Sequence, residues 1–308
     1  MTNKKARTIQ EQIVLLKDRG LQIKEEQNAA SYLEHISYYR LKGYWWNMQE
    51  NLEQHIFKPG SCFEDVIERY NFDRELRQIL FDAIEMIEVS LRANLINCMS
   101  CDCSQEGLWY LSPDFFESES YFLQNLEKLR REFARSNEIF AKDFREKHSS
   151  KSKEHWESDD NPDAWLILET ATLGTLSKIY KNLKHQLPQK SKIANKMGFC
   201  SHRDLSSCLE AVAYIRNIVA HHSRIWGRTM VKRPAYPLKT VHPFVIDFKS
   251  IQDKKPFYIM SVMLYMSKVI NPQCAFKEKL ISLFERYPNI PLRLLGFTES
   301  WRNEPVWS

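Results

Sequence analysis

Glycine is scarce in this chain, with 8 residues among 308. The scarcity argues against a turn-dense β architecture, and neither common glycine-rich phosphate loop, G-x-x-x-x-G-K-[ST] or G-x-G-x-x-G, occurs. Long apolar runs are lacking too, since the longest, around Phe257–Met266, is too short to span a bilayer. The amino-terminal residues MTNKKARTIQEQ carry no apolar signal core. We therefore expect a cytoplasmic protein without a membrane span.

Cysteine is present, but in a number that argues against disulfide bonds. The chain has seven cysteines, and an odd count in a chain of this length favours free thiols over a disulfide framework. Cys98, Cys101 and Cys103 could form part of a zinc site if folding brought His148 and His155 near them. No second Cys or His pair follows at finger-like spacing, so we expect no metal site. No cofactor is expected either.

The overall composition is that of a soluble globular protein, with 43% hydrophobic and 27% charged residues. Its length accommodates one large domain or two modest ones. The formal net charge of +5 and a pI near 8.7 make the chain mildly basic. That balance is compatible with a polyanionic partner such as RNA, although it does not identify one.

Apolar residues recur at spacings of three and four along most of the chain, and no convincing set of alternating strands occurs. This periodicity predicts an all-α fold. The polar stretch before residue 163 is expected to be a loop, and the basic stretch Lys184–Lys196 either a solvated loop or a track for phosphates. The predicted helices are 8–18, 27–40, 63–97, 118–147, 161–183 with Asn161 as N-cap, 203–222, 256–270 and 275–287.

One short segment near a predicted helix end concentrates groups suited to phosphodiester chemistry. Arg216 begins an R-x4-H pattern that ends at His221, with Asn217 after the arginine and His222 after the histidine. A guanidinium can hold phosphate oxygens, and an imidazole can transfer protons near neutral pH. The amide could orient the imidazole. The alternative is structural, because Arg and His also occur where they complement the carboxyl end of a helix dipole.

The angular positions of these residues raise a difficulty. At about 100° per residue, Asn217 and His221 share one face of the helix, whereas Arg216 lies roughly 140° from His221. Either the helix unwinds near Ala220, or the site combines residues from two copies of the chain. A symmetric dimer with the two 203–222 helices near its axis would build such a composite cleft.

Basic and aromatic residues elsewhere are candidates for RNA contact. Residues 38–46 form a dense cluster of aromatic and basic side chains, among them Arg40, Lys42 and Tyr44. They form either a packed corner of the core or a surface that stacks bases and meets phosphates. Further candidates for phosphate contact are Lys190, Lys192 and Arg224.

Five segments in a fixed order are specific as a set: Ile36–Leu41 with Gly43 and Tyr44, Tyr70–Arg77, Ile87–Arg92, Leu173–Ser177 with Tyr180, and Arg216–His222 with Arg224 and Trp226. Together they resemble the Abi-like (AbiD/AbiF) abortive-infection proteins of the HEPN superfamily. The resemblance implies a HEPN-like helical bundle with amino- and carboxyl-terminal helical extensions. The expected divisions are 1–60, a core at 61–230 with a polar insertion around 145–163, and 231–308.

The resemblance also implies an activity. HEPN proteins are usually homodimers whose R-x4–6-H motif cleaves RNA without a metal, which assigns catalysis to Arg216 and His221, with Asn217 as the adjoining amide and His222 as an additional histidine. The RNA 2′-hydroxyl would be the nucleophile. Such proteins act as toxins in phage defence or toxin–antitoxin systems, some with a small noncoding RNA as partner. The alternative is a non-catalytic HEPN protein that only binds RNA.

Overall fold

The computed structural model describes residues 5–102, 106–148, 161–245 and 247–308. Within these residues the chain forms twelve α-helices, several short 3-10 turns and one two-stranded hairpin. The all-α prediction is therefore confirmed. No helix in the described part of the chain is long and apolar enough to cross a membrane.

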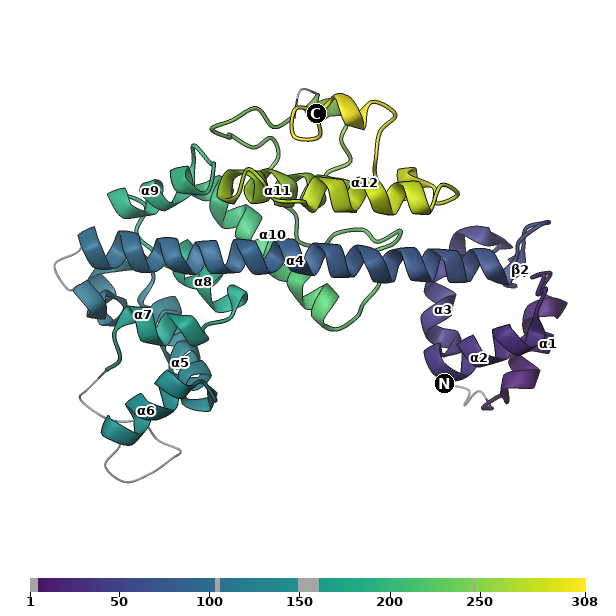
Figure 1. The fold of residues 1–308 in the computed structure, drawn as a ribbon, viewed down its shortest axis with the longest axis horizontal. Coiled ribbons are helices and arrows are strands. Elements are labelled where there is room, and N and C mark those ends of the chain that lie inside the picture. The colour runs from purple at the N-terminus through teal and green to yellow at the C-terminus, as the bar shows by residue number, and fades with distance from the viewer. Residues whose placement is uncertain (1–4, 103–105, 149–160, 246) are drawn as a thin grey trace.

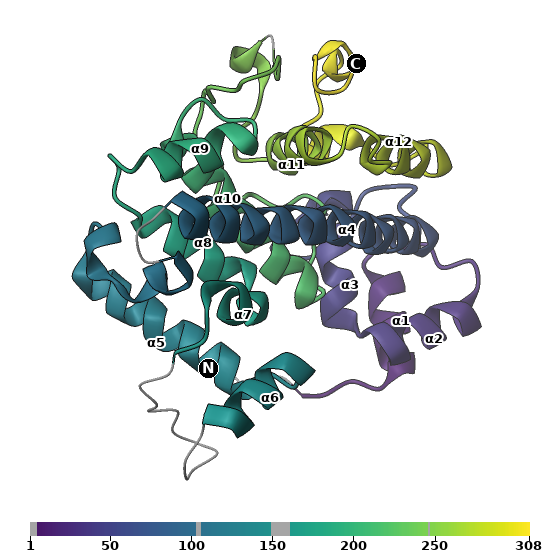
Figure 2. The same ribbon diagram turned by 60° about the vertical axis from the view of Figure 1, so that its left-hand side comes forward.

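The helix α4 (Phe63–Asp102) is the axis of the molecule (Figure 1). Its 40 residues make it about 60 Å long. Helices α11 (Pro256–Ile270) and α12 (Phe276–Arg286) cover one side, and α8 (Leu173–Asn182) and α10 (His202–Ala220) contact another (Figures 1 and 2). The buried stripe of α4 has the spacing of three and four that predicted the helix: Phe72, Leu76, Leu80, Ile84, Ile87, Leu91 and Leu95.

At one end of α4 lie α1 (Ile9–Asp18), α2 (Glu26–Ile36), α3 (Tyr38–Trp45) and the hairpin of β1 (Gln49–Asn51) and β2 (Ile56–Phe57). The prediction of one helix over 27–40 is wrong, because the chain breaks at Ser37. That residue has a φ of 73°, and its hydroxyl accepts a hydrogen bond from the backbone N–H of Arg40. Serine is a preferred residue at this capping position, so α3 starts afresh there.

The other end of α4 carries α5 (Glu119–Arg135), α6 (Ile139–His148), α7 (Ala164–Ile167), α8 and α9 (Pro188–Lys196). The predicted helix 118–147 is divided after Arg135. The predicted helix 161–183 begins at Ala164, with Asp163 in place of Asn161 as its N-cap, and is interrupted by extended backbone at Ala171 and Thr172. The basic stretch Lys184–Lys196 is helical from Pro188 onward, and only its first four residues form a turn.

The carboxyl-terminal helices match their predictions closely, since 256–270 and 275–287 correspond to α11 and α12. Twelve of the fifteen residues of α11 are buried. A cluster of aromatic rings packs beside it: Phe257, Phe284, Phe297, Trp301 and Trp307. This segment is continuous with the core around α4, since α11 and α12 both contact that helix.

Candidate functional site

Helix α10 ends at Ala220, immediately before the two histidines. The backbone N–H of His222 donates to the carbonyl of Val219 at 2.9 Å, and that of Ser223 donates to the carbonyl of Ile218 at 2.8 Å. This pair of bonds is the Schellman arrangement that closes many helices. It places His221 at the C-cap and His222 in the next position, where the backbone turns left-handed.

His222 occupies a position that glycine usually fills. Its φ is 53°, and a side chain in that region is strained by roughly 1–2 kcal/mol. Its carbonyl accepts a hydrogen bond from the Nη1 of Arg40 at 2.7 Å. Arg40, expected to contact RNA, therefore holds the histidine turn from α3. Non-glycine residues in such conformations cluster at functional sites, which makes His222 a candidate functional residue as well as a helix terminator.

Asp73 on α4 fixes the chain just beyond this turn. Its carboxylate is fully buried and accepts hydrogen bonds from the backbone N–H groups of Ile225 at 3.0 Å and Trp226 at 2.7 Å. The other oxygen accepts from the hydroxyl of Tyr44 at 2.7 Å and pairs with Arg77. Burial raises the pKa of Asp73, and Arg77, Tyr44 and the two backbone groups act in the opposite direction.

Arg216 lines a cleft of about 410 Å³ between α4 and α10. Glu88 and Arg92 of α4 line the same cleft and pair with each other at 3.2 Å. Burial raises the pKa of Glu88, while the charges of Arg92 and Arg216 lower it. The i,i+4 spacing of Glu88 and Arg92 on a helix indicates by itself only a surface or half-buried ion pair. The E-x3-R spacing reveals such a pair, but nothing in it shows that Arg216 shares the cleft.

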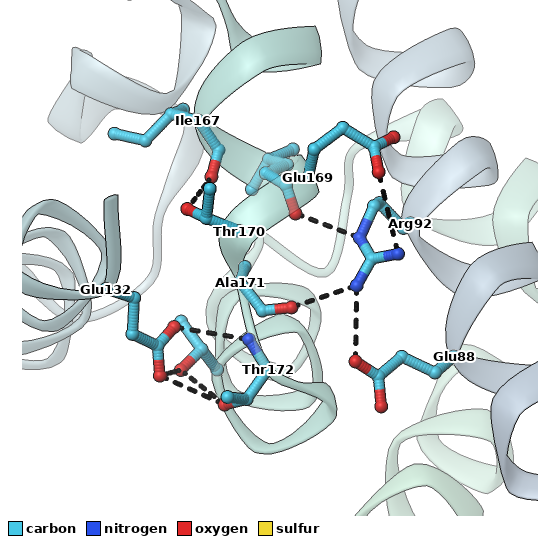
Figure 3. A network of polar contacts seen from close by, with 10 residues as sticks. Glu88, Arg92, Glu132, Ile167, Glu169, Thr170, Ala171 and Thr172 are labelled. Carbon is cyan, nitrogen blue, oxygen red and sulfur yellow. Dashed lines mark hydrogen bonds and ion pairs between the residues drawn. The ribbon is translucent and has the colours of Figure 1, made fainter. Parts of the chain in front are cut away.

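Arg92 also connects α4 to the segment before α8 (Figure 3). Its guanidinium donates to the carbonyls of Leu168 at 2.9 Å and Ala171 at 3.0 Å, and Glu169 lies 3.7 Å away. These contacts set the extended backbone that interrupts the predicted helix. Because every one of them comes from a residue distant in sequence, the interruption was not visible in the periodicity.

Glu132 of α5 caps the amino end of α8 on the other side of this network (Figure 3). Its carboxylate accepts from the backbone N–H of Thr172 at 3.2 Å, from the Thr172 hydroxyl at 3.0 Å and from the Thr175 hydroxyl at 2.9 Å. A negative charge there complements the helix dipole. Figure 3 shows that Glu132 of α5 and Arg92 of α4 bind the short segment before α8 from opposite sides.

The structure places the four predicted catalytic residues around one helix end but does not bring Arg216 and His221 into contact. Arg216 is half-buried and donates to the Oδ1 of Asn217 at 3.3 Å, so the amide is bound to the arginine and not to an imidazole. His221 and His222 are exposed. The helix does end at Ala220, which is one of the two alternatives that the angular mismatch allowed.

Two predicted RNA-binding residues point into the protein. Tyr44 is 1% exposed and bonded to Asp73, and burial raises the pKa of its hydroxyl. Lys190 is fully buried, and its Nζ donates to the carbonyls of Lys181 and Leu183 at the end of α8. The prediction of RNA contact is therefore wrong for both residues, because their polar groups are buried and bind other parts of the protein.

The remaining candidates differ in exposure. Lys192 is exposed on α9 and Lys42 is half-buried on α3. Arg224 is half-buried and donates to the carbonyl of Trp226, so it braces the loop that Asp73 anchors. Its side chain lies against Gly43, where an added Cβ would come within 3.0 Å of the Arg224 Nε. A larger residue at position 43 would therefore require the Arg224 side chain to shift by a few tenths of an ångström.

The cysteine cluster does not form a recognisable ligand set within the described residues. Cys98 is buried and Cys101 exposed, both on α4. Cys103 and His155 lie outside the described residues, as does most of the polar insertion expected at 145–163. No group of three or more His, Cys, Asp or Glu side chains in the described ranges could hold a metal ion.

The fold and the site define an all-α protein in which an arginine, an amide and two histidines surround one anchored helix end. A family model described as Abi-like protein matches residues 31–227. The chain belongs to this family, and membership indicates a role in abortive infection, a defence against phage. No curated protein and no solved structure matches the chain.

Proposed function

We propose that this protein is a metal-independent endoribonuclease that acts as a toxin in phage defence, with His221 as the proton-transfer group and Arg216 as the transition-state cation. The observation that carries the proposal is the anchored helix end, which exposes two histidines one turn beyond an arginine in a cleft. A small noncoding RNA is the proposed controlling partner, on the grounds of the family resemblance alone.

The proposed reaction uses the substrate's own nucleophile. The 2′-oxygen of the ribose attacks the adjacent phosphorus and loses its proton to a base, while the 5′-oxygen of the next nucleotide leaves and takes up a proton. His221 serves this acid–base exchange, and Arg216 stabilises the charge on the phosphorane-like transition state. The products are a 2′,3′-cyclic phosphate and a 5′-hydroxyl.

We further propose that the complete site is shared by two copies of the chain. Arg216 and His221 do not meet within one copy, and the small cleft is flanked by apolar side chains that are unusually open to solvent. Phe81 is 52% exposed and Val89 is 50% exposed. Exposed apolar residues that gather around a functional cleft are typical of an interaction surface. A two-fold dimer through this face would bring one copy's His221 toward the other copy's Arg216.

Cleavage of RNA in the presence of EDTA tests the catalytic assignment. His221→Ala is expected to lower the rate by about 10²–10⁴-fold and Arg216→Ala by about 10²–10³-fold. His35→Ala makes the same chemical change at an exposed histidine of α2 and is expected to leave the rate unchanged. If His221→Ala cleaves RNA as fast as the wild type, the mechanism is wrong and RNA binding without catalysis becomes the better assignment.

Mixing the two inactive variants tests the shared site. In a mixed dimer, the arginine of the His221→Ala copy meets the histidine of the Arg216→Ala copy at one of the two sites. Random reassociation should therefore restore about a quarter of the wild-type activity. Sites confined to one chain would give no recovery.

A further inference from the structure

A second and larger cleft, of about 1100 Å³, lies between α5, α8 and α10. Its wall on α10 includes Glu210, Tyr214 and Asn217, which share one helix face, and the next residue on that face is His221. The wall from Glu210 to His221 is about 16 Å long. The volume is slightly above the range of small-molecule pockets, which measure about 300–1,000 Å³. An open, elongated cleft of this kind suits a segment of a polymer.

The charges that line this cleft leave two cations available. Six lysines and arginines and four glutamates line it, and Glu117 accepts the backbone N–H of His185 at 2.6 Å. Arg135 and Lys178 are exposed and form no ion pair within the described residues. The other lining side chains pair among themselves: Lys128 with Glu132, Arg131 with Glu127, and Lys181 and Lys232 with Glu210. The cleft therefore carries a net positive charge, which favours binding of a phosphate backbone.

Two tyrosines give the cleft surfaces on which bases can stack. Tyr121 of α5 is 62% exposed, and Tyr214 of α10 lines the opposite wall. The Tyr214 hydroxyl accepts a hydrogen bond from Arg228 at 3.4 Å, which fixes its orientation. Aromatic rings can stack with unpaired bases, whereas the bases of a duplex are stacked on each other and unavailable.

We propose that this cleft binds a single-stranded RNA segment and leads it along α10 to His221. The identity of the polymer rests on the proposed ribonuclease function, and the location rests on the cleft itself. Arg135 and Lys178 contact phosphates, Tyr121 and Tyr214 stack bases, and Asn217 stands where the cleft reaches the catalytic helix end.

Gly174 allows the cleft to be blocked without damaging the fold. It lines the cleft on the first turn of α8, and a Cβ there would meet no heavy atom closer than the Thr172 Oγ1 at 4.0 Å. Gly174→Glu brings a carboxylate into the cleft at a helix end where negative charge is favourable. Gly174→Gln brings the same bulk without the charge and separates steric from electrostatic effects.

The assay measures the affinity of the full-length protein for a labelled, unpaired RNA of about 12 nucleotides. Gly174→Glu is expected to weaken binding by at least tenfold, and Gly174→Gln by less. Replacing Arg135 and Lys178 together with alanine should flatten the slope of log K against log salt by about 1.4, because each phosphate contact on a single strand contributes about 0.7. The matched control replaces Arg203 and Lys249, which are exposed and outside the cleft, and should bind normally.

The outcomes separate this proposal from the proposed function. If the cleft variants bind single-stranded RNA as the wild type does, or if a duplex of the same length competes equally well, the cleft is not the RNA path, whether or not the protein cleaves RNA. If the cleft variants lose binding while the wild type binds but does not cleave, the RNA path stands and the catalytic assignment fails. If the wild type binds no RNA, both are overturned.

Discussion

Replacing Asp73 by asparagine should destabilise the protein, because it breaks the buried Asp73–Arg77 ion pair beside the loop that follows the two histidines. The isosteric amide keeps one oxygen for the backbone N–H groups of Ile225 and Trp226, but it turns an NH2 donor toward Arg77, which is 6% exposed. Breaking one side of a buried charge pair costs about 3–5 kcal/mol. For a chain of 308 residues, this loss corresponds to a fall in Tm of about 5–8 °C.

Chemical denaturation of Asp73→Asn, Arg77→Met and the double variant measures this cost. Because removing both members of the pair leaves no unpaired charge, the double variant should be less destabilised than the sum of the two single variants, by more than about 0.5 kcal/mol. Additive effects, or an Asp73→Asn protein within about 1 kcal/mol of the wild type, would refute the view that Asp73 and Arg77 are coupled as a buried ion pair.

Two further predictions concern single residues. Burial lowers the pKa of Lys190 to about 8, so the folded protein loses this proton at lower pH than the unfolded chain and its stability should rise with pH above 8. In denaturant titrations, the unfolding free energy of the wild type relative to Lys190→Met should increase by about 1–2 kcal/mol between pH 8 and 9.5. If the unfolding free energies of the two proteins depend on pH in the same way, the reasoning is contradicted. His222→Gly should relieve the strained backbone and raise the unfolding free energy by up to about 1 kcal/mol. The same substitution should slow RNA cleavage if the imidazole takes part in the reaction. Unchanged cleavage would show that His222 serves only to terminate the helix.

Long periodic helices could be predicted from the sequence because their apolar stripes are long enough to be unambiguous. The prediction of 203–222 came within two residues of the observed α10, and 256–270 matches α11. The breaks at Ser37 and Thr172 were missed because each depends on a few hydrogen bonds. The first has a local cause, a serine cap. The second depends on Arg92 and Glu132, both distant in sequence.

The candidate site was only partly predictable for a related reason. A motif shows which residue types are present, but burial decides which of them can meet a ligand. Lys190 resembles any basic surface residue in the sequence, and only the fold shows that its ammonium group terminates α8. Arg40 was expected to contact RNA, and only the fold shows that its guanidinium also donates to the His222 carbonyl. The cleft beside α10 combines residues from three helices, and no sequence spacing reveals such a combination.

The extent of the family match has a practical consequence for dissecting the protein. The match ends at residue 227, yet α12 lies on α4 with Phe284 against Phe72, and the hydroxyl of Tyr287 donates to Glu75 at 2.6 Å. A fragment trimmed to the matched residues would expose this apolar side of α4 to water. Its inactivity would then report misfolding or aggregation.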